Sequence, residues 1–314
     1  MMPRQSGAAL LSAMLTVALV ATLASASLWQ QWRSLEIETA ERGRLQSQWI
    51  LFGALDWARL ILREDARSGG ADHLAEPWAI PLEEARLSTF LASSNADSDA
   101  LDTSTTLAQT FLSGRITDLQ SRMNVRNLVD NGLVSDPAMA AFGRLFVKLQ
   151  LPPGELTALA ENLRLALETP GVQRSSGSVP LMPQRVNQLG WLGLSQKSVD
   201  ALSPYVTILP VRTPVNLNTA NATVLQATIP RVDAALVQRL ITLREGKHFA
   251  SVADAIAAMG EPKDRIDENQ HSVTSQYFEV HGQMRQDKVV VQQHSVVQRL
   301  GLEVKTLWTD RGPG

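Results

Sequence analysis

Residues 8–29 read AALLSAMLTVALVATLASASLW and contain no charged side chain. They follow a short polar leader, MMPRQSG (residues 1–7), whose only charged side chain is Arg4. Because a helix rises about 1.5 Å per residue, the apolar segment is just long enough to cross a hydrocarbon core of roughly 30 Å. The sequence therefore predicts a single membrane-spanning helix close to the N-terminus.

A cleavable secretory signal peptide is the competing interpretation of this segment. Such a peptide has a shorter apolar core and then a site with small residues, and residues 24–27 come close to offering one. The leader favours another route, because Gly7 stands at the boundary between polar and apolar residues and small Ala8 and Ala9 follow it. This ending resembles the leader of type IV prepilins, which a dedicated prepilin peptidase cuts after the glycine. The resemblance implies that the apolar helix stays in the mature chain, where Ser12 stands in place of the glutamate of most pilins.

The overall composition limits the classes of function. The chain has 314 residues, 44% of them hydrophobic, and a formal net charge of -2. The part beyond the apolar segment is long enough for two modest domains, or for one domain with an insertion. The near-neutral charge gives no electrostatic footprint for a polyanion, which disfavours bulk nucleic-acid binding. Since cysteine is absent, disulfides, thiolate metal sites and cysteine nucleophiles are excluded.

The helical pattern continues beyond the apolar segment. Apolar residues recur every three or four positions up to about Arg67, where Ser68 and two glycines end the pattern. We predict one helix over residues 8–67, whose first half faces lipid or a helix bundle and whose amphipathic second half docks on a folded body. Of four tryptophans on it, the first two are expected in an interfacial aromatic belt and the last two against a sheet: Trp29, Trp32, Trp49 and Trp57.

The rest of the chain combines helix and strand signals. A polar stretch at residues 91–110 indicates a surface loop, and a strand is expected at residues 115–119. Helices are predicted to begin at Asp136, with Asp136 as the N-cap, and after Pro153, and to cover residues 186–202, 220–227, 232–244 and 252–259. The last has a capping box of Ser251 and Asp254. Alternating residues between 278 and 308 predict three antiparallel strands.

This order of parts resembles minor pseudopilin K of type II secretion systems, whose pilin-like body carries a large helical insertion. Four stretches carry the resemblance: REDARSGGADHLAEPWA (63–79), GRITDLQSRMNVRNLV (114–129), PYVTILP (204–210) and VNLNTANATVL (215–225). Subunits of this type are similar in lacking the pilin glutamate, so Ser12 fits the resemblance. The implied fold class is α+β, with a long N-terminal helix packed on an antiparallel sheet and a large all-α insertion domain.

The resemblance also divides the chain. We expect a leader, a transmembrane and assembly helix, a first part of the pilin-like body, an inserted helical domain and the C-terminal strands of the body, at residues 1–7, 8–29, 30–125, 126–272 and 273–314. The implied function is that of a minor pseudopilin at the tip of the periplasmic pseudopilus, supporting export of folded proteins. The implied partners are prepilin peptidase and minor pseudopilins I and J, and the implied place is the inner membrane, with a single span and a periplasmic body.

Within the apolar helix, processing is expected between Gly7 and Ala8. The assembly residues are predicted to be Ala9, Ser12, Ala13 and Ala18, because small side chains let helices approach closely.

Some members of this family bind calcium through a D-W-x-D-x-D run and a later G-A-E. Here the corresponding residues 161–171 read ENLRLALETPG, and Glu161 with Glu168 is too sparse for an ion that takes six to eight oxygen ligands. A second acidic group, Asp97, Asp99 and Asp102, is interpreted as part of a solvated linker. We therefore assign no cofactor and no metal, although the resemblance leaves calcium open.

Residues 216–256 resemble a helix-hairpin-helix unit, which offers backbone N–H groups to DNA phosphate. In the hairpin, residues 229–233 lack the expected glycines, and Asp233 would repel phosphate. We therefore favour a protein-interaction module and do not expect nucleic acid as a partner. The alternative function is a minor pilin of a type IV pilus or DNA-uptake system that contacts nucleic acid through this unit.

No sequence motif points to an enzyme. The five histidines are scattered and interpreted as surface or loop residues: His73, His248, His271, His281 and His294. No nucleophile elbow or phosphate-binding glycine loop follows a strand. A membrane-anchored hydrolase stays as a minor alternative, since catalytic groups can be far apart in sequence.

Overall fold

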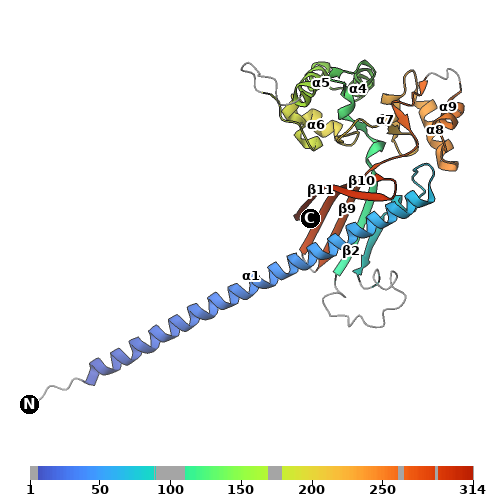
Figure 1. The fold of residues 1–314 in the computed structure, drawn as a ribbon. Coiled ribbons are helices and arrows are strands. Elements are labelled where there is room, and N and C mark those ends of the chain that lie inside the picture. Colours follow the sequence, from blue (N-terminus) through green and yellow to red (C-terminus); the bar gives the residue numbers. More distant parts are fainter. Residues whose placement is uncertain are drawn as a thin grey trace, which may run out of the picture. The chain divides into compact units, whose positions relative to one another are not determined.

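A computed structural model describes residues 6–87, 89, 110–168, 179–260, 265–286 and 289–313. The chain forms two compact units, residues 1–53 and 54–314, which are described in turn. The first unit consists of the greater part of helix α1 (Ser6–Ser68), which Figure 1 draws as one continuous ribbon. The predicted long helix is confirmed. It ends where Gly69 and Gly70 take positive φ angles of 68° and 114°, which glycine adopts without steric cost.

The second unit contains a five-stranded antiparallel sheet of order β1-β2-β9-β10-β11. Its strands are β1 (Leu82–Arg86), β2 (Thr110–Asp118), β9 (Tyr277–Gln286), β10 (Val289–Leu300) and β11 (Glu303–Pro313). The three predicted C-terminal strands are confirmed. The strand expected at residues 115–119 begins earlier, at Thr110, and β1 was not predicted.

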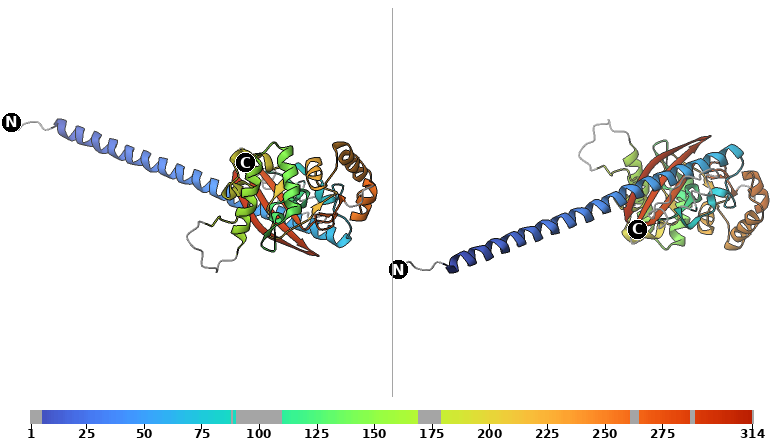
Figure 2. Two further views of the ribbon diagram at one scale, coloured as in Figure 1. Left: turned by 90° about the horizontal axis from the view of Figure 1, so that it is seen from above. Right: turned by 90° about the horizontal axis from the view of Figure 1, so that it is seen from below.

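The C-terminal part of α1 covers one face of this sheet (Figure 2). Leu55, Ala58 and Leu62 of α1 form a buried cluster with residues of η1, β9, β10 and β11: Trp78, Phe278, Val280, Val297 and Val304. The amphipathic second half predicted for the helix therefore docks as expected. Trp49 and Trp57 do not follow the prediction, because they are 73% and 40% exposed and the docking face of the helix is built from smaller aliphatic residues. The aromatic belt expected for Trp29 and Trp32 stays a prediction.

Between β2 and β9 the chain forms what we call the helical segment, residues 119–276. Its helices are α4 (Asp136–Lys148), α5 (Pro153–Leu167), α6 (Gln196–Leu202), α7 (Ala222–Thr228), α8 (Ala234–Gly246) and α9 (Val252–Met259). One apolar core runs through all of them and includes Phe142, Leu159 and Val224. Short 3-10 helices complete it, namely η2 (Leu119–Ser121), η3 (Val125–Leu128) and η4 (Val186–Leu192), while η1 (Pro77–Ala79) lies before β1.

The segment is not purely helical as predicted. Three two-stranded pairs tie its loops together: β3 (Met123–Asn124) with β6 (Val206–Thr207), β4 (Val129–Asp130) with β5 (Leu133–Val134), and β7 (Val215–Asn216) with β8 (His271–Ser272). These strands are too short to give an alternating pattern in the sequence.

Local signals explain most helix boundaries. Ser251 accepts a hydrogen bond from the Asp254 amide and Asp254 accepts one from the Ser251 amide, which confirms the capping box. The helix expected over residues 186–202 is instead η4 and α6, because Gly193 adopts φ 98° between them. Ser135, and not Asp136, is the N-cap of α4. The α+β fold class is confirmed, and the five-part division of the chain stays a prediction.

Candidate functional site

The N-terminal unit presents an apolar surface. From Leu10 to Ile37, the large apolar side chains of α1 are 53–72% exposed. Among the described residues, α1 is the one helix that is long and apolar enough to cross a membrane. Exposed apolar surface of this extent is stable only when lipid or another helix covers it.

Several hydroxyl groups in the apolar part of this helix bond to its own backbone carbonyls. The Ser12 hydroxyl donates to the carbonyl of Ala9 at 3.0 Å, and the Thr16 hydroxyl donates to Ala13 at 2.9 Å. Such bonds remove the cost of carrying a polar group in hydrocarbon. Ser12 is therefore compatible with a membrane span without any partner residue.

The predicted processing and assembly residues lie at different positions around this helix. Gly7 and Ala8 belong to its first turns. Ala9, Ser12 and Ala13 are three or four residues apart and share one face, whereas Ala18, nine residues after Ala9, lies on the opposite face at 100° per residue. Their roles in processing and assembly stay predictions.

The hairpin of the helix-hairpin-helix-like unit uses its own residues to close. Ile229 is fully buried, and Arg231 occupies a left-handed conformation with φ 55°, where glycine is expected. The Asp233 carboxylate accepts a hydrogen bond from the Leu236 amide at 2.7 Å and so caps α8. A carboxylate therefore occupies the helix end that would receive a phosphate, and the protein-interaction interpretation stays a prediction.

The acidic residues considered for calcium are either paired with an arginine or lie outside the described residues. Arg164 bonds Glu161 at 3.0 Å and also pairs with Glu168 on the surface of α5. Asp97, Asp99 and Asp102 lie outside the described part of the chain.

A buried polar group, here called the junction, joins the sheet to the helical segment. Its members come from widely separated positions: Asp65, Asp72, Asp118, Asn216, Thr219, Ser275 and Arg299. One oxygen of Asp118 accepts bonds from the side chains of Thr219 at 2.6 Å, Ser275 at 2.7 Å and Asn216 at 3.1 Å. Three of the four stretches that carry the family resemblance, residues 63–79, 114–129 and 215–225, meet here.

The junction holds charged side chains that are largely shielded from solvent. Arg299 pairs with Asp65 and Asp72 and donates to the carbonyl of Ser275 at 2.9 Å. Burial raises the pKa of Asp118 to about 6, and the bonds from Thr219, Ser275 and the Gln120 amide offset only part of this effect. Burial likewise raises the pKa of Asp72, against the opposing charge of Arg299. Because each charged side chain has a bonding partner, the junction fixes the position of the helical segment on the sheet.

Asp65, Asp72 and Glu76 also stand close enough together to be considered as metal ligands. Arg299 already pairs with both aspartates, and the Trp78 indole donates to Glu76 at 2.6 Å. Burial raises the pKa of Glu76 to about 7. This acidic group is therefore internally paired.

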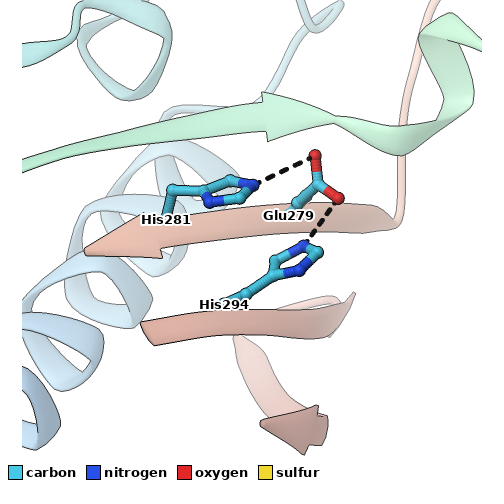
Figure 3. A group of neighbouring side chains, drawn as sticks. All are labelled: Glu279, His281 and His294. Carbon is cyan, nitrogen blue, oxygen red and sulfur yellow. Dashed lines mark hydrogen bonds and ion pairs between the residues drawn. The ribbon is translucent and has the colours of Figure 1, made fainter. Parts of the chain in front are cut away.

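A second titratable cluster lies on the sheet (Figure 3). Glu279 and His281 belong to β9, and His294 is the cross-strand partner of His281 on β10. The two imidazole rings stack with centroids 4.2 Å apart. Both rings direct a nitrogen at the Glu279 carboxylate, with Nε2 of His294 at 2.7 Å and Nε2 of His281 at 3.7 Å. These two histidines are partly exposed, as expected, but they lie side by side in strands and are not scattered. The surface or loop interpretation is wrong for His271, which is 1% exposed in β8.

The register of the β9–β10 hairpin is the local signal for this cluster. Residues 286 and 289 pair at the end of the β9–β10 hairpin, and counting back from that turn places position 281 opposite 294. His73 and His248 also stack, at 3.8 Å, but they come from distant segments and no local pattern predicts their contact.

Comparisons with known proteins agree with this architecture. Two family models described as type II secretion system protein K match residues 121–211 and 215–274. Type II secretion system protein K of Pseudomonas aeruginosa is 25% identical over 303 residues, which cover 88% of this chain and 83% of that protein. The crystal structure of the GspK-GspI-GspJ complex from enterotoxigenic Escherichia coli contains a chain similar in fold, with a TM-score of 0.63 and 19% identity, covering 87% of this chain and 98% of that one.

Proposed function

The chain belongs to the family of type II secretion system protein K, the minor pseudopilins, and from this premise we propose that it caps the pseudopilus of a type II secretion system. In this proposal residues 8–29 hold the protein in the inner membrane until assembly, and the second unit lies in the periplasm. A prepilin peptidase removes the leader after Gly7. The observation that supports this best is the exposed apolar helix followed by a pilin-type sheet with a large insertion.

Assembly follows from the chemistry of the apolar helix. Its side chains from Leu10 to Ile37 are covered by lipid before assembly and by neighbouring pseudopilin helices afterwards. Small residues such as Ala9 and Ala13 permit close approach on one face, and Ala18 offers a second contact on the other. Since Ser12 carries no carboxylate, this subunit lacks the group that pairs with the amino terminus of a preceding pilin.

The helical segment supports a place at the tip. An insertion of this size on the pilin-like body obstructs a further subunit above it. A crystal structure of a similar protein is that of a GspK-GspI-GspJ complex. We therefore propose minor pseudopilins I and J as the partners of this chain, and a structural role without catalysis.

The N-terminus of the mature protein tests the processing step. The full-length chain is coexpressed with a prepilin peptidase, and its intact mass and N-terminal residue are determined. We expect a chain that begins at Ala8, and a Gly7→Val variant that keeps its leader. Cleavage near Ser27 would instead make this an exported protein with a signal peptide, and an uncut wild-type chain would also contradict the proposal.

Assembly is tested by coexpression in membranes with I and J subunits. We expect both to copurify with the mature chain after detergent extraction. Leu15→Arg, which places a charge in the apolar helix, is expected to remove copurification, while the matched surface variant Leu302→Arg leaves it unchanged. Copurification that survives Leu15→Arg would show that the apolar helix is not the assembly surface.

A further inference from the structure

We propose that Glu279, His281 and His294 form a binding site for one divalent transition-metal ion, with zinc as the best match. The site lies on the face of the sheet that α1 does not cover. Phe278 and Val280 pack against α1, and alternate residues of a strand point to opposite faces, so Glu279 and His281 face away from that helix. This inference does not depend on the proposed function.

The backbone brings the three side chains together without strain. The register of β9 and β10 places His281 directly opposite His294, and Glu279 lies two residues along on the same face. One ligand atom from each residue lies within 4.8 Å of the others. The Glu279 carboxylate receives both rings, at 2.7 Å from His294 and 3.7 Å from His281. On binding, we expect side-chain rotations to replace these contacts by zinc–ligand bonds of about 2.0–2.2 Å.

The donor set selects the class of ion. Two imidazole nitrogens and one carboxylate are a common zinc ligand set, with water in the fourth position. Calcium and magnesium prefer oxygen ligands throughout and are disfavoured by the two rings. The side chains of His281 and His294 are 37% and 34% exposed, whereas Glu279 is 12% exposed. An ion therefore has a path from solvent to a carboxylate that is itself shielded.

Neighbouring residues hold the ligands in place. Trp308 and His294 make an edge-to-face contact with ring centroids 4.9 Å apart, and the Arg185 guanidinium lies over the Trp308 ring. Arg122 bonds the second oxygen of Glu279 at 3.3 Å, which leaves the oxygen that faces His294 for an ion. Burial alone raises the pKa of Glu279, but both histidines and Arg122 outweigh it and hold that pKa well below its usual range. The carboxylate is therefore charged and fixed.

The second histidine stack provides a matched control. His73 and His248 stack more closely, at 3.8 Å, but Nε2 of His73 is 4.0 Å from Glu76, whose other oxygen accepts from the Trp78 indole. This pair lacks a carboxylate shared between two ring nitrogens. Removing His248 therefore removes a stacked imidazole without touching the proposed site.

Zinc titration of the full chain tests the proposal. The protein is purified in detergent micelles with a tag free of histidine, stripped with a chelator and titrated with zinc by calorimetry. We expect one ion per chain and at least a tenfold weaker affinity for His281→Asn and His294→Asn, with His248→Asn unchanged. Cobalt in place of zinc is expected to give d–d absorption bands that His294→Asn abolishes, and excess calcium is expected not to displace it.

Far-ultraviolet circular dichroism confirms that each variant is folded; both histidines are partly exposed, so their replacement by asparagine leaves the buried sheet face intact. Substoichiometric zinc binding by the wild type would overturn the proposal. So would equal binding by wild type and His294→Asn, or an equal loss in His248→Asn, which would indicate nonspecific capture by histidine rings.

Discussion

Residues 10–37 of α1 expose large apolar side chains, whereas the junction between the sheet and the helical segment buries charged and polar ones. In the first region the apolar side chains from Leu10 onward need lipid or a neighbouring helix to cover them. In the second, the charged side chains bond to other residues of the same chain: Arg299 donates to Asp72, and Asp118 accepts from Ser275. Soluble proteins ordinarily bury apolar side chains and expose charged ones. The apolar helix exposes apolar side chains, and the junction buries polar and charged ones.

The difference separates assembly from folding. A buried ion pair contributes little net stability over apolar packing, but removal of one partner is costly, so it specifies one geometry. The junction therefore fixes where the helical segment meets the sheet. The apolar helix specifies no geometry of its own, and its position depends on lipid or neighbouring helices.

The largest effect is expected from Arg299→Met. This change leaves buried Asp72 and largely buried Asp65 without their cation, and we expect the free energy of unfolding to fall by about 3–5 kcal/mol. Chemical denaturation of the full chain in micelles, followed by circular dichroism, measures it. Arg164→Met, which removes an arginine paired on the surface of α5, is expected to change stability far less. Similar losses in both variants would contradict the role assigned to the junction.

How much of this was predictable from sequence depends on the range of the signal. The long helix, the α9 capping box and the three C-terminal strands follow from local periodicity and were predicted. Strand β1 has the sequence LEEAR, which favours helix locally, and it is a strand because it pairs with β2. Strand β1 therefore depends on a contact with a distant part of the chain, which the residues next to it do not reveal.

The same limit applies to the two polar clusters. Arg299 and Asp72 of the junction are 227 positions apart, so their pairing has no local pattern. His281 and His294 are close in sequence, and their contact required only the register of one hairpin. The membrane-spanning segment, by contrast, was predicted directly from its composition and length, at residues 8–29.

Leu19→Arg tests the apolar helix, the first of the two regions compared. A charge at the centre of a membrane span costs about 3 kcal/mol, and we expect the variant to lose retention in the membrane fraction. The stability of the sheet is expected to stay unchanged, since Leu19 belongs to the first unit. Carbonate extraction measures retention, with Leu302→Arg as the control, because Leu302 is also exposed but belongs to the second unit. Full retention of Leu19→Arg would argue against a span at this position.

The pH dependence of stability isolates Asp118. Its folded-state pKa of about 6 lies above the ordinary value of 3.8, so its contribution is fully present below pH 3.8 and is lost as the pH rises through 6. The difference amounts to roughly 3 kcal/mol across this window. Glu279 acts in the opposite sense, because a lowered pKa contributes stability that is lost only as the pH falls below about 4.5. The stability of the wild type relative to Asp118→Asn should therefore decline between pH 4 and 7, and parallel profiles would disprove the assignment.

Asn216→Ala is expected to have the smallest effect of the four. The Asn216 amide donates to Asp118 at 3.1 Å and to Ser275 at 2.9 Å, and the residue is fully buried. Its removal takes one donor from Asp118 and one from Ser275. Because Asp118 keeps its bonds from Thr219 and Ser275, we expect a loss of about 2 kcal/mol, near the cost of an unsatisfied buried group. Asn269→Ala removes an exposed amide that bonds Asp267 and should leave stability unchanged. A loss for Asn216→Ala as large as that for Arg299→Met would mean that the neutral bonds, and not the ion pairs, hold the helical segment on the sheet.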